Sequence, residues 1–319
     1  MKFSETQLQG FAAPLSESED QMCQNAIGMV RDALKLLGLS DDNRPITKML
    51  TETHAYMLEM KNPFTNRRVK IFIQGSYANN TCVRKESDVD IAIVQEEVFQ
   101  TEYRPGITDA HYNFYTVSAT DKSFKDEVQE CLTIKFRNDV ERKNKSIKVH
   151  GNTYRKDADT VPCMRLRNYK DDYELNESNF VGGIVITADS GERIINYPEQ
   201  HIENGRKKNT ETKHVYKRMV RIIKKMRCLM EDYSYTSAGR VSSFGLESLL
   251  WNIPNEIYAK YTSLRYIFDE VAKYAYDKRH LLSSYREANG IKLLCPNQTD
   301  VANYQAFLTD LVGFYEYDI

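Results

Sequence analysis

The chain has 319 residues, 41% of them hydrophobic and 28% charged, which is typical of a globular protein and long enough for two domains. Its formal net charge of −1 lacks the basic excess of proteins that bind long nucleic acid along the backbone. No apolar run approaches the roughly 18 residues that a membrane-spanning helix requires, and the six cysteines are scattered without a Cys-x-x-Cys pair. Composition therefore argues against a membrane protein and against long nucleic acid as a partner. It favours a cytoplasmic protein and leaves the oligomeric state open.

The first 60 residues are expected to form an irregular arm, over residues 1–15, and then two helices. Ser16 and Glu19 have the spacing of a capping box, and apolar residues recur at helical spacing from there to Gly38, which supplies a C-cap. We expect a second helix over residues 46–60.

A strand and a glycine turn follow. The next segment has an apolar run typical of a buried strand, made of Val69, Ile71, Phe72 and Ile73, and Gln74-Gly75-Ser76 ends it. Gly75 lets the backbone approach a ligand closely, and Ser76 offers a hydroxyl and an N–H group to a phosphate oxygen. This turn is therefore a candidate triphosphate site.

A second strand, over residues 89–94, opens with Asp88 and Asp90. Residues i and i+2 of a strand point to the same face, so the two carboxylates lie side by side. Their repulsion calls for a cation, and magnesium, which prefers carboxylate oxygens, is the simplest candidate. A triphosphate turn beside a metal-binding strand is the arrangement that phosphoryl or nucleotidyl transfer requires.

The next segment is expected to contain a long helix, over residues 121–143, and then mainly strands. Residues 181–186 and 192–197 have the pattern of a hairpin. Between the helix and the hairpin, a further strand is expected, and it begins at an acidic pair, Asp157 and Asp159. Two-metal sites call for a third carboxylate from a neighbouring strand, and strand parity does not choose between these two acids.

The last third of the chain is expected to be helical. Residues 198–209 are polar and basic, and we interpret them as a linker between two domains, 1–200 and 201–319. Helical periodicity predicts helices over 211–233, 258–274 and 301–317. The expected fold class is α/β (α+β): a small mixed sheet flanked by helices, then a helical C-terminal lobe, with a nucleotide site between the two.

Gln74-Gly75-Ser76-Tyr77, followed by Ser87-Asp88-Val89-Asp90-Ile91, resembles the signature of the polymerase-β-like nucleotidyltransferases. In particular it resembles the cGAS/DncV-like nucleotidyltransferases (CD-NTases), which implies a polymerase-β-like core with a helical C-terminal lobe. The resemblance selects Asp159 as the third carboxylate, because Asp159-Thr160-Val161-Pro162 is similar to the family's Asp-x-x-Pro motif. It implies that Asp88, Asp90 and Asp159 are catalytic and bind two magnesium ions, with manganese as a possible substitute.

The resemblance also implies residues that bind the substrate phosphates. Gln74, Gly75 and Ser76 form one such group in the turn. The run from Val220 to Lys224 is similar to the family's Arg-x-x-Lys helix, whose lysine reaches the triphosphate, and Lys225 stays an alternative to Lys224. Ser242 or Ser243 is a suitable N-cap for the next helix, and the family pattern assigns a phosphate contact to Ser243.

The implied activity is synthesis of a cyclic di- or trinucleotide second messenger from ribonucleoside triphosphates (ATP, GTP or both, with pyrimidines possible). The implied setting is bacterial anti-phage (CBASS) signalling, in which the product activates a separate effector protein. Two alternatives remain: transfer of a nucleotide to an RNA, protein or small-molecule acceptor, and nucleotide binding without catalysis. The sequence does not reveal the bases, the linkage, the ring size, the mode of activation or a role for residues 96–120.

Overall fold

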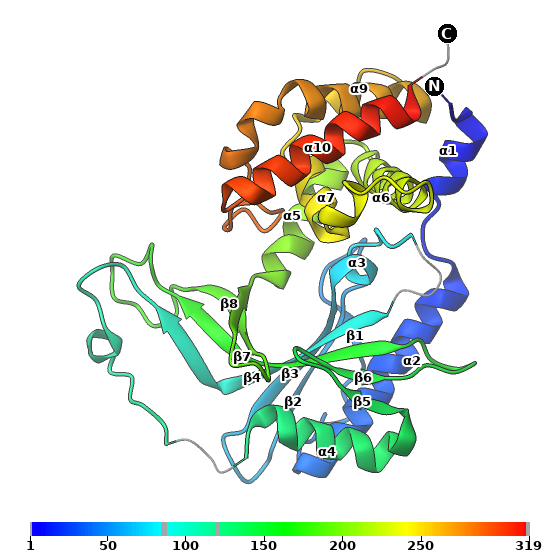
Figure 1. The fold of residues 1–319 in the computed structure, drawn as a ribbon. Coiled ribbons are helices and arrows are strands. Elements are labelled where there is room, and N and C mark those ends of the chain that lie inside the picture. Colours follow the sequence, from blue (N-terminus) through cyan, green and yellow to red (C-terminus); the bar gives the residue numbers. More distant parts are fainter. Residues whose placement is uncertain (1, 84–87, 119–121, 317–319) are drawn as a thin grey trace. The chain divides into compact units, whose positions relative to one another are not determined.

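The computed structural model describes residues 2–83, 88–118 and 122–316 of the chain. They form two compact units (Figure 1). The sheet unit comprises Ser16–Tyr77 and Asp88–Glu199, and the helical unit comprises Met1–Leu15, Ala78–Ser87 and Gln200–Ile319. The two units are interleaved along the chain, whereas the domain boundary predicted after residue 200 divides the chain only once.

The sheet unit is built on nine described strands, and only one pair of them, β4 and β7, is parallel. Their order is β1-β2-β3-β4-β7-β6-β5, and β8 pairs with both β7 and β9. The strands are β1 Thr47–Lys48, β2 Tyr56–Lys61, β3 Arg68–Gln74, β4 Val89–Glu102, β5 Val140–Arg142, β6 Ile147–Val149, β7 Ala158–Asn168, β8 Val181–Thr187 and β9 Arg193–Asn196. The predicted mixed sheet is thus confirmed.

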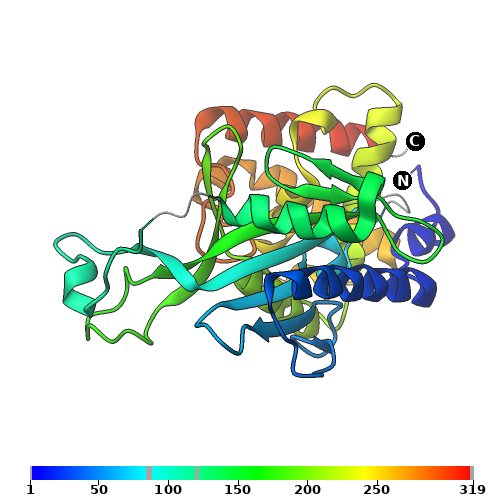
Figure 2. The same cartoon turned by 90° about the horizontal axis from the view of Figure 1, so that it is seen from below.

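Two helices, α2 (Glu17–Leu34) and α4 (Phe124–Phe136), lie side by side on one face of this sheet (Figures 1 and 2). Ser16 caps α2 as predicted: its hydroxyl accepts from Glu19 N–H, and the Glu19 side chain accepts from Ser16 N–H. Side chains alternate along β4, so Ala92 and Val94 join an apolar cluster with Phe72 of β3 on one face. Because Asp90 lies two residues before Ala92, its side chain is on the face of that cluster.

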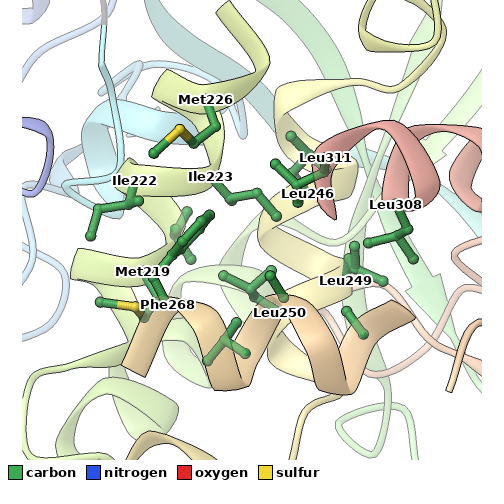
Figure 3. Packing of buried hydrophobic residues seen from close by; sticks show 14 of the residues in the cluster. Met219, Ile222, Ile223, Met226, Leu246, Leu249, Leu250, Phe268, Leu308 and Leu311 are labelled. Atoms are coloured by element: carbon green, nitrogen blue, oxygen red, sulfur yellow. The ribbon is translucent and has the colours of Figure 1, made fainter. Parts of the chain in front are cut away.

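The helical unit is built around α6 (Tyr216–Asp232), α7 (Ser243–Trp251), α9 (Leu264–Asp277) and α10 (Gln298–Tyr315). Figure 3 shows part of their packing: Ile223 of α6 points toward Leu246 and Leu250 of α7, and Met219, Met226 and Phe268 belong to the same fully buried cluster. Further α-helices described in this unit are α1 Glu5–Phe11, α5, which begins in the sheet unit and spans Pro198–Glu211, and α8 Asn255–Tyr258, and two short 3₁₀ helices span Ala238–Arg240 and Arg279–Ser284. The predicted helical C-terminal lobe is therefore present.

Two predictions near the N-terminus are wrong. Residues 1–15 are not an irregular arm, because Ser4 forms a capping box that starts α1 and Leu8 of this helix is completely buried. Residues 46–60 are not a helix. Tyr56, Leu58 and Met60 are buried while the residues between them are more exposed, which is the two-residue period of a strand, and hydrogen bonds to β3 stabilise β2 in that form.

Two further boundaries differ from the sequence prediction. The helix predicted over residues 121–143 is the shorter α4, because Arg137, at φ 54°, ends it and the chain turns into β5; residue 121 itself lies outside the described part. The polar segment 198–209 is not a linker but helix α5. Its buried side chains include His201, Ile202 and Lys208, so partners within the unit hold it in place.

Cys131, Cys163 and Cys228 are buried, and none of the cysteines in the described residues forms a disulfide. No helix within the described residues has the length and apolar character needed to cross a membrane.

Candidate active site

Four side chains form a row across adjacent strands of the sheet unit. Asp90 of β4 lies opposite Gln74 of β3 on one side and opposite Asp159 of the parallel strand β7 on the other. Asp159 in turn lies opposite Lys148 of β6. Residues directly opposite each other in a sheet point to the same face, so the row brings two carboxylates, an amide and an ammonium group together.

Two further acids, Asp88 and Asp157, lie two residues before Asp90 and Asp159, immediately ahead of strands β4 and β7. Lys148 reaches both: its Nζ is 2.8 Å from Asp88 Oδ2 and 3.2 Å from Asp157 Oδ2. The Asp88 carboxylate accepts this hydrogen bond and thereby raises the pKa of Lys148, so the ammonium stays charged. Asp88 is therefore paired with a lysine.

The structure gives Asp157 and Asp159 different partners. Asp157 Oδ1 accepts a hydrogen bond from Gly151 N–H; burial opposes ionisation, but this bond and Lys148 together lower the pKa of Asp157. Asp159 instead lies beside Asp90, and its only described cation partner, Lys143, is 3.5 Å away. This placement supports Asp159 as the third carboxylate, in line with the resemblance, while Asp157 holds the loop at Gly151.

Gly75 is in direct contact with Asp90. Its φ of +69° lies in the left-handed region, and a Cβ atom added there would be 2.5 Å from Asp90 Oδ2. Both features require glycine, because L-residues avoid this φ and no side chain fits against the carboxylate. Ser76 follows in α3 (Gly75–Ala78), where its side chain is partly buried. The predicted turn and the Asp-x-Asp strand are thus adjacent in space.

The surroundings of Asp90 oppose ionisation of its carboxyl group. Burial, followed by the charges of Asp159 and Asp88, raises the pKa of Asp90 to about 7. A carboxyl group whose pKa is raised in this way lacks a positive charge that would stabilise its ionised form. Hard divalent cations take carboxylate oxygens as ligands, so this donor set fits such an ion.

No three His, Cys, Asp or Glu side chains of the described residues are already arranged as a metal site. The pairing of Asp88 with Lys148 accounts for part of this, since the carboxylate oxygens point toward the ammonium group. Asp88, Asp90 and Asp159 would hold a cation once Lys148 gives up its contact with Asp88.

The other predicted phosphate-binding residues belong to the helical unit. Lys224 of α6 is buried, with its Nζ 2.9 Å from Glu247 Oε2 of α7. Lys225 is only partly buried. Ser242 is the N-cap of α7, with its Oγ accepting from Gly245 N–H at 2.9 Å, while Ser243 is the first helical residue and is exposed. Cap and candidate phosphate contact are therefore separate serines.

Sequence reasoning did not single out Lys148 or Glu247. A signal existed for both. Lys148 lies between Ile147 and Val149 in an alternating strand, so its side chain had to point to the other face. Glu247 is an acid next to Leu246 in the apolar part of a helix, where a carboxylate needs a buried partner.

Comparison with known proteins gives the family. The family model described as "cGAS/DncV-like nucleotidyltransferase C-terminal helical domain" matches residues 203–316, and the one described as "Nucleotidyltransferase domain" matches residues 57–180. The cyclic GMP-AMP synthase CdnE03 of Staphylococcus schleiferi is 43% identical over 318 residues, which are 99% of this chain and 98% of that protein.

Two further relatives point the same way. The cyclic dipyrimidine nucleotide synthase CdnE of Cecembia lonarensis is 32% identical over 287 residues, covering 90% of this chain and 88% of that protein. The solved structure of the Elizabethkingia meningoseptica CdnE cyclic dinucleotide synthase with GTP and Apcpp superposes with a TM-score of 0.73 at 31% identity, covering 99% of this chain and 100% of that one. With full-length relatives of this similarity, the chain belongs to the cGAS/DncV-like nucleotidyltransferases and is an enzyme of that family.

Proposed function

We propose that this enzyme joins two ribonucleoside triphosphates into a cyclic dinucleotide. The observation that carries the proposal is the row in the sheet unit that places Asp90 beside Asp159, with Asp88 just before the same strand and Gly75 against the Asp90 carboxylate. It is supported by the names of the relatives, which are synthases of cyclic GMP-AMP, cyclic dipurine and cyclic dipyrimidine nucleotides.

In this proposal, Asp88, Asp90 and Asp159 hold divalent magnesium, with two ions and manganese as an alternative. A cation bound there would lower the pKa of the attacking ribose hydroxyl and neutralise charge on the phosphates. Gly75 leaves the space that the Asp90 carboxylate occupies, and Ser76 donates to a phosphate oxygen. Lys224 and Ser243 of the helical unit bind the β- and γ-phosphates.

The substrates are ATP, GTP or a pyrimidine nucleoside triphosphate. Solved structures of relatives contain GTP and Apcpp, or Apcpp and Upnpp. This supports both purine and pyrimidine nucleoside triphosphates as candidate substrates. The product would act as a second messenger in anti-phage defence and activate a separate effector protein.

A product assay tests the proposal. The protein is incubated with all four ribonucleoside triphosphates and Mg²⁺ or Mn²⁺, treated with phosphatase and analysed by mass spectrometry. We expect a phosphatase-resistant product with the mass of a cyclic dinucleotide, and its loss by orders of magnitude in a folded Asp90→Asn variant.

Other outcomes identify the alternatives. Product only when RNA, protein or a small acceptor is added indicates transfer to that acceptor. Binding of a triphosphate without pyrophosphate release under any condition indicates a protein that binds nucleotides without catalysis. Undiminished turnover in Asp90→Asn would remove the carboxylate site from the mechanism.

A further inference from the structure

A cluster of four buried polar side chains lies inside the helical unit. Lys224 comes from α6, Glu247 from α7, His201 from α5, and Thr81 from the segment that follows α3. The exposed fractions of Lys224 and Glu247 are 2% and 1%, and Thr81 is completely buried. Three helices and one loop therefore meet at these groups.

The ammonium group of Lys224 is fully engaged. Its Nζ lies 2.9 Å from Glu247 Oε2, 3.1 Å from Thr81 Oγ1 and 3.2 Å from the Thr81 carbonyl oxygen. An ammonium group has three N–H donors, so each has one acceptor. Lys224 can bind a phosphate oxygen only by exchanging one of these three bonds.

Glu247 is the common partner in the cluster. Its Oε2 accepts from Lys224 and, at 2.7 Å, from the Thr81 hydroxyl, and its Oε1 lies 3.0 Å from His201 Nε2. Burial opposes ionisation of this carboxyl group, but the charges of Lys224 and His201 outweigh it and hold the pKa of Glu247 well below its usual range. The carboxylate thus stays charged inside the unit.

The three bonds of Lys224 differ in how easily they are exchanged. Separation from Glu247 would leave a buried carboxylate without its main counter-charge, which is strongly unfavourable. Loss of a bond to Thr81 removes only an interaction with a neutral oxygen, and a phosphate oxygen is a stronger, charged acceptor. A phosphate therefore replaces Thr81 and not Glu247 as a partner of Lys224.

We infer that Glu247 is a positioning residue that holds the Lys224 ammonium group ready for the substrate triphosphate, an inference that rests on the proposed phosphate role of Lys224. A lysine side chain has four rotatable bonds, and fixing them costs entropy when the ligand binds. The bond to Glu247 fixes the ammonium group beforehand, so the triphosphate binds to a prearranged cation.

The test is a double-mutant cycle on binding, with inorganic triphosphate as the probe in the presence of Mg²⁺. Calorimetry gives the dissociation constants of the wild type, Glu247→Gln, Lys224→Met and the double variant. We expect each single variant to bind about tenfold more weakly or worse, and the double variant to bind no more weakly than Lys224→Met. The matched control is Glu231→Gln, since Glu231 pairs with Arg227 of α6 at 2.8 Å but not with Lys224; it should bind as the wild type does.

Two variants keep the test decisive if Glu247→Gln does not fold. Glu247→Asp keeps the buried charge, but its side chain is one methylene shorter and moves the carboxylate away from Lys224. It should therefore also weaken triphosphate binding. Thr81→Val removes the Oγ1 acceptor that the phosphate replaces, so its affinity should stay within about twofold of the wild type.

The possible failures are distinguishable. If Lys224→Met binds triphosphate as the wild type does, the phosphate role of Lys224 is wrong and this inference falls with it. If Lys224→Met loses affinity while Glu247→Gln or Glu247→Asp does not, or if the losses simply add in the double variant, the phosphate role stands and the positioning role of Glu247 is overturned.

Discussion

At the scale of single residues, the contact between Gly75 and Asp90 links backbone conformation to the site. The left-handed φ of Gly75 and the 2.5 Å approach of a hypothetical Cβ to Asp90 Oδ2 are independent constraints. Gly191, in the same unit, has a similar φ of +84° but no atom within 4 Å of its hypothetical Cβ. Alanine substitutions at Gly75 and Gly191 therefore distinguish the effect of backbone strain from the effect of displacing the Asp90 carboxylate.

We expect Gly75→Ala to reduce turnover by about 100-fold or more, because displacing a reacting group by about 1 Å has effects of this size. Gly191→Ala should lower the free energy of unfolding by about 1 to 2 kcal/mol, the cost of a left-handed alanine, and leave turnover unchanged. Product formation and urea unfolding measure the two effects. Equal losses of activity in both variants would mean that strain alone, and not Asp90, is responsible.

Lys148 is the second residue whose role depends on one contact. It pairs with Asp88 at 2.8 Å, and Asp157, at 3.2 Å, offers it an alternative carboxylate. A cation at Asp88 therefore competes with the Lys148 ammonium group for the Asp88 carboxylate. Lys148 can still pair with Asp157 when the cation displaces it.

Lys148→Met should bind Mn²⁺ about three- to fivefold more tightly, since a partly exposed ion pair contributes up to about 1 kcal/mol. Titration of the nucleotide-free protein by calorimetry measures this affinity without reference to activity. Lys145→Met is the matched control, because Lys145 forms a solvent-exposed pair with Glu192 at 3.2 Å. An unchanged Mn²⁺ affinity in Lys148→Met would show that the lysine does not compete for the site.

At the scale of elements, the start of α7 separates two functions between neighbouring serines. Ser242 caps the helix through Gly245 N–H, and Ser243 is exposed in the first turn, where the dipole of the helix favours an anion. Gly245 has no room for a side chain, because a Cβ there would be 1.6 Å from the Tyr304 hydroxyl. The position of this turn is therefore fixed by packing.

We expect Ser242→Ala to lower the free energy of unfolding by about 1 kcal/mol, the usual contribution of an N-cap. Ser243→Ala should change stability by less than about 0.5 kcal/mol but raise the KM for the triphosphate substrate, because it removes a phosphate contact and not the cap. Chemical unfolding and steady-state kinetics on both variants check this. The same profile for both serines would contradict the separation.

The elements also show what the sequence could predict. The strand that ends at Gln74 and the strand that begins at Val89 were predictable. Each is an apolar run next to a recognisable motif: Gly75-Ser76 for the first, Asp88 and Asp90 for the second. Placement of Asp159 required the parallel pairing of β4 with β7, which is not a local property, and only family resemblance supplied it. Residues 46–60 and 198–209 were mispredicted because their structure depends on partners distant in sequence: β3 pairs with the first, and Ile253 and Glu247 bind side chains of the second.

At the scale of the whole molecule, the chain enters the helical unit three times. Residues 1–15 and 78–87 contribute to the unit that residues 200–319 complete. Arg221 of α6, which is 5% exposed, donates to the carbonyl oxygens of Ala12 and Asn80, one from each of the two earlier segments. Lys224 likewise depends on Thr81. Two buried cations thus take acceptors from outside the C-terminal segment.

For this reason we expect residues 200–319 alone not to fold stably, although they include the whole match to the C-terminal helical family model. Leaving a buried charge without its partners costs about 3 to 5 kcal/mol, a large part of the 5 to 15 kcal/mol that stabilises a typical domain. Circular dichroism and limited proteolysis of the isolated segment measure the effect. The same segment with Arg221→Met lacks the buried cation whose described acceptors, Ala12 and Asn80, are both missing, and it should regain part of its protease resistance. A stable, protease-resistant 200–319 segment with both cations in place would show that the earlier segments are dispensable, and that the domain boundary predicted near residue 200 is also a boundary of independent folding.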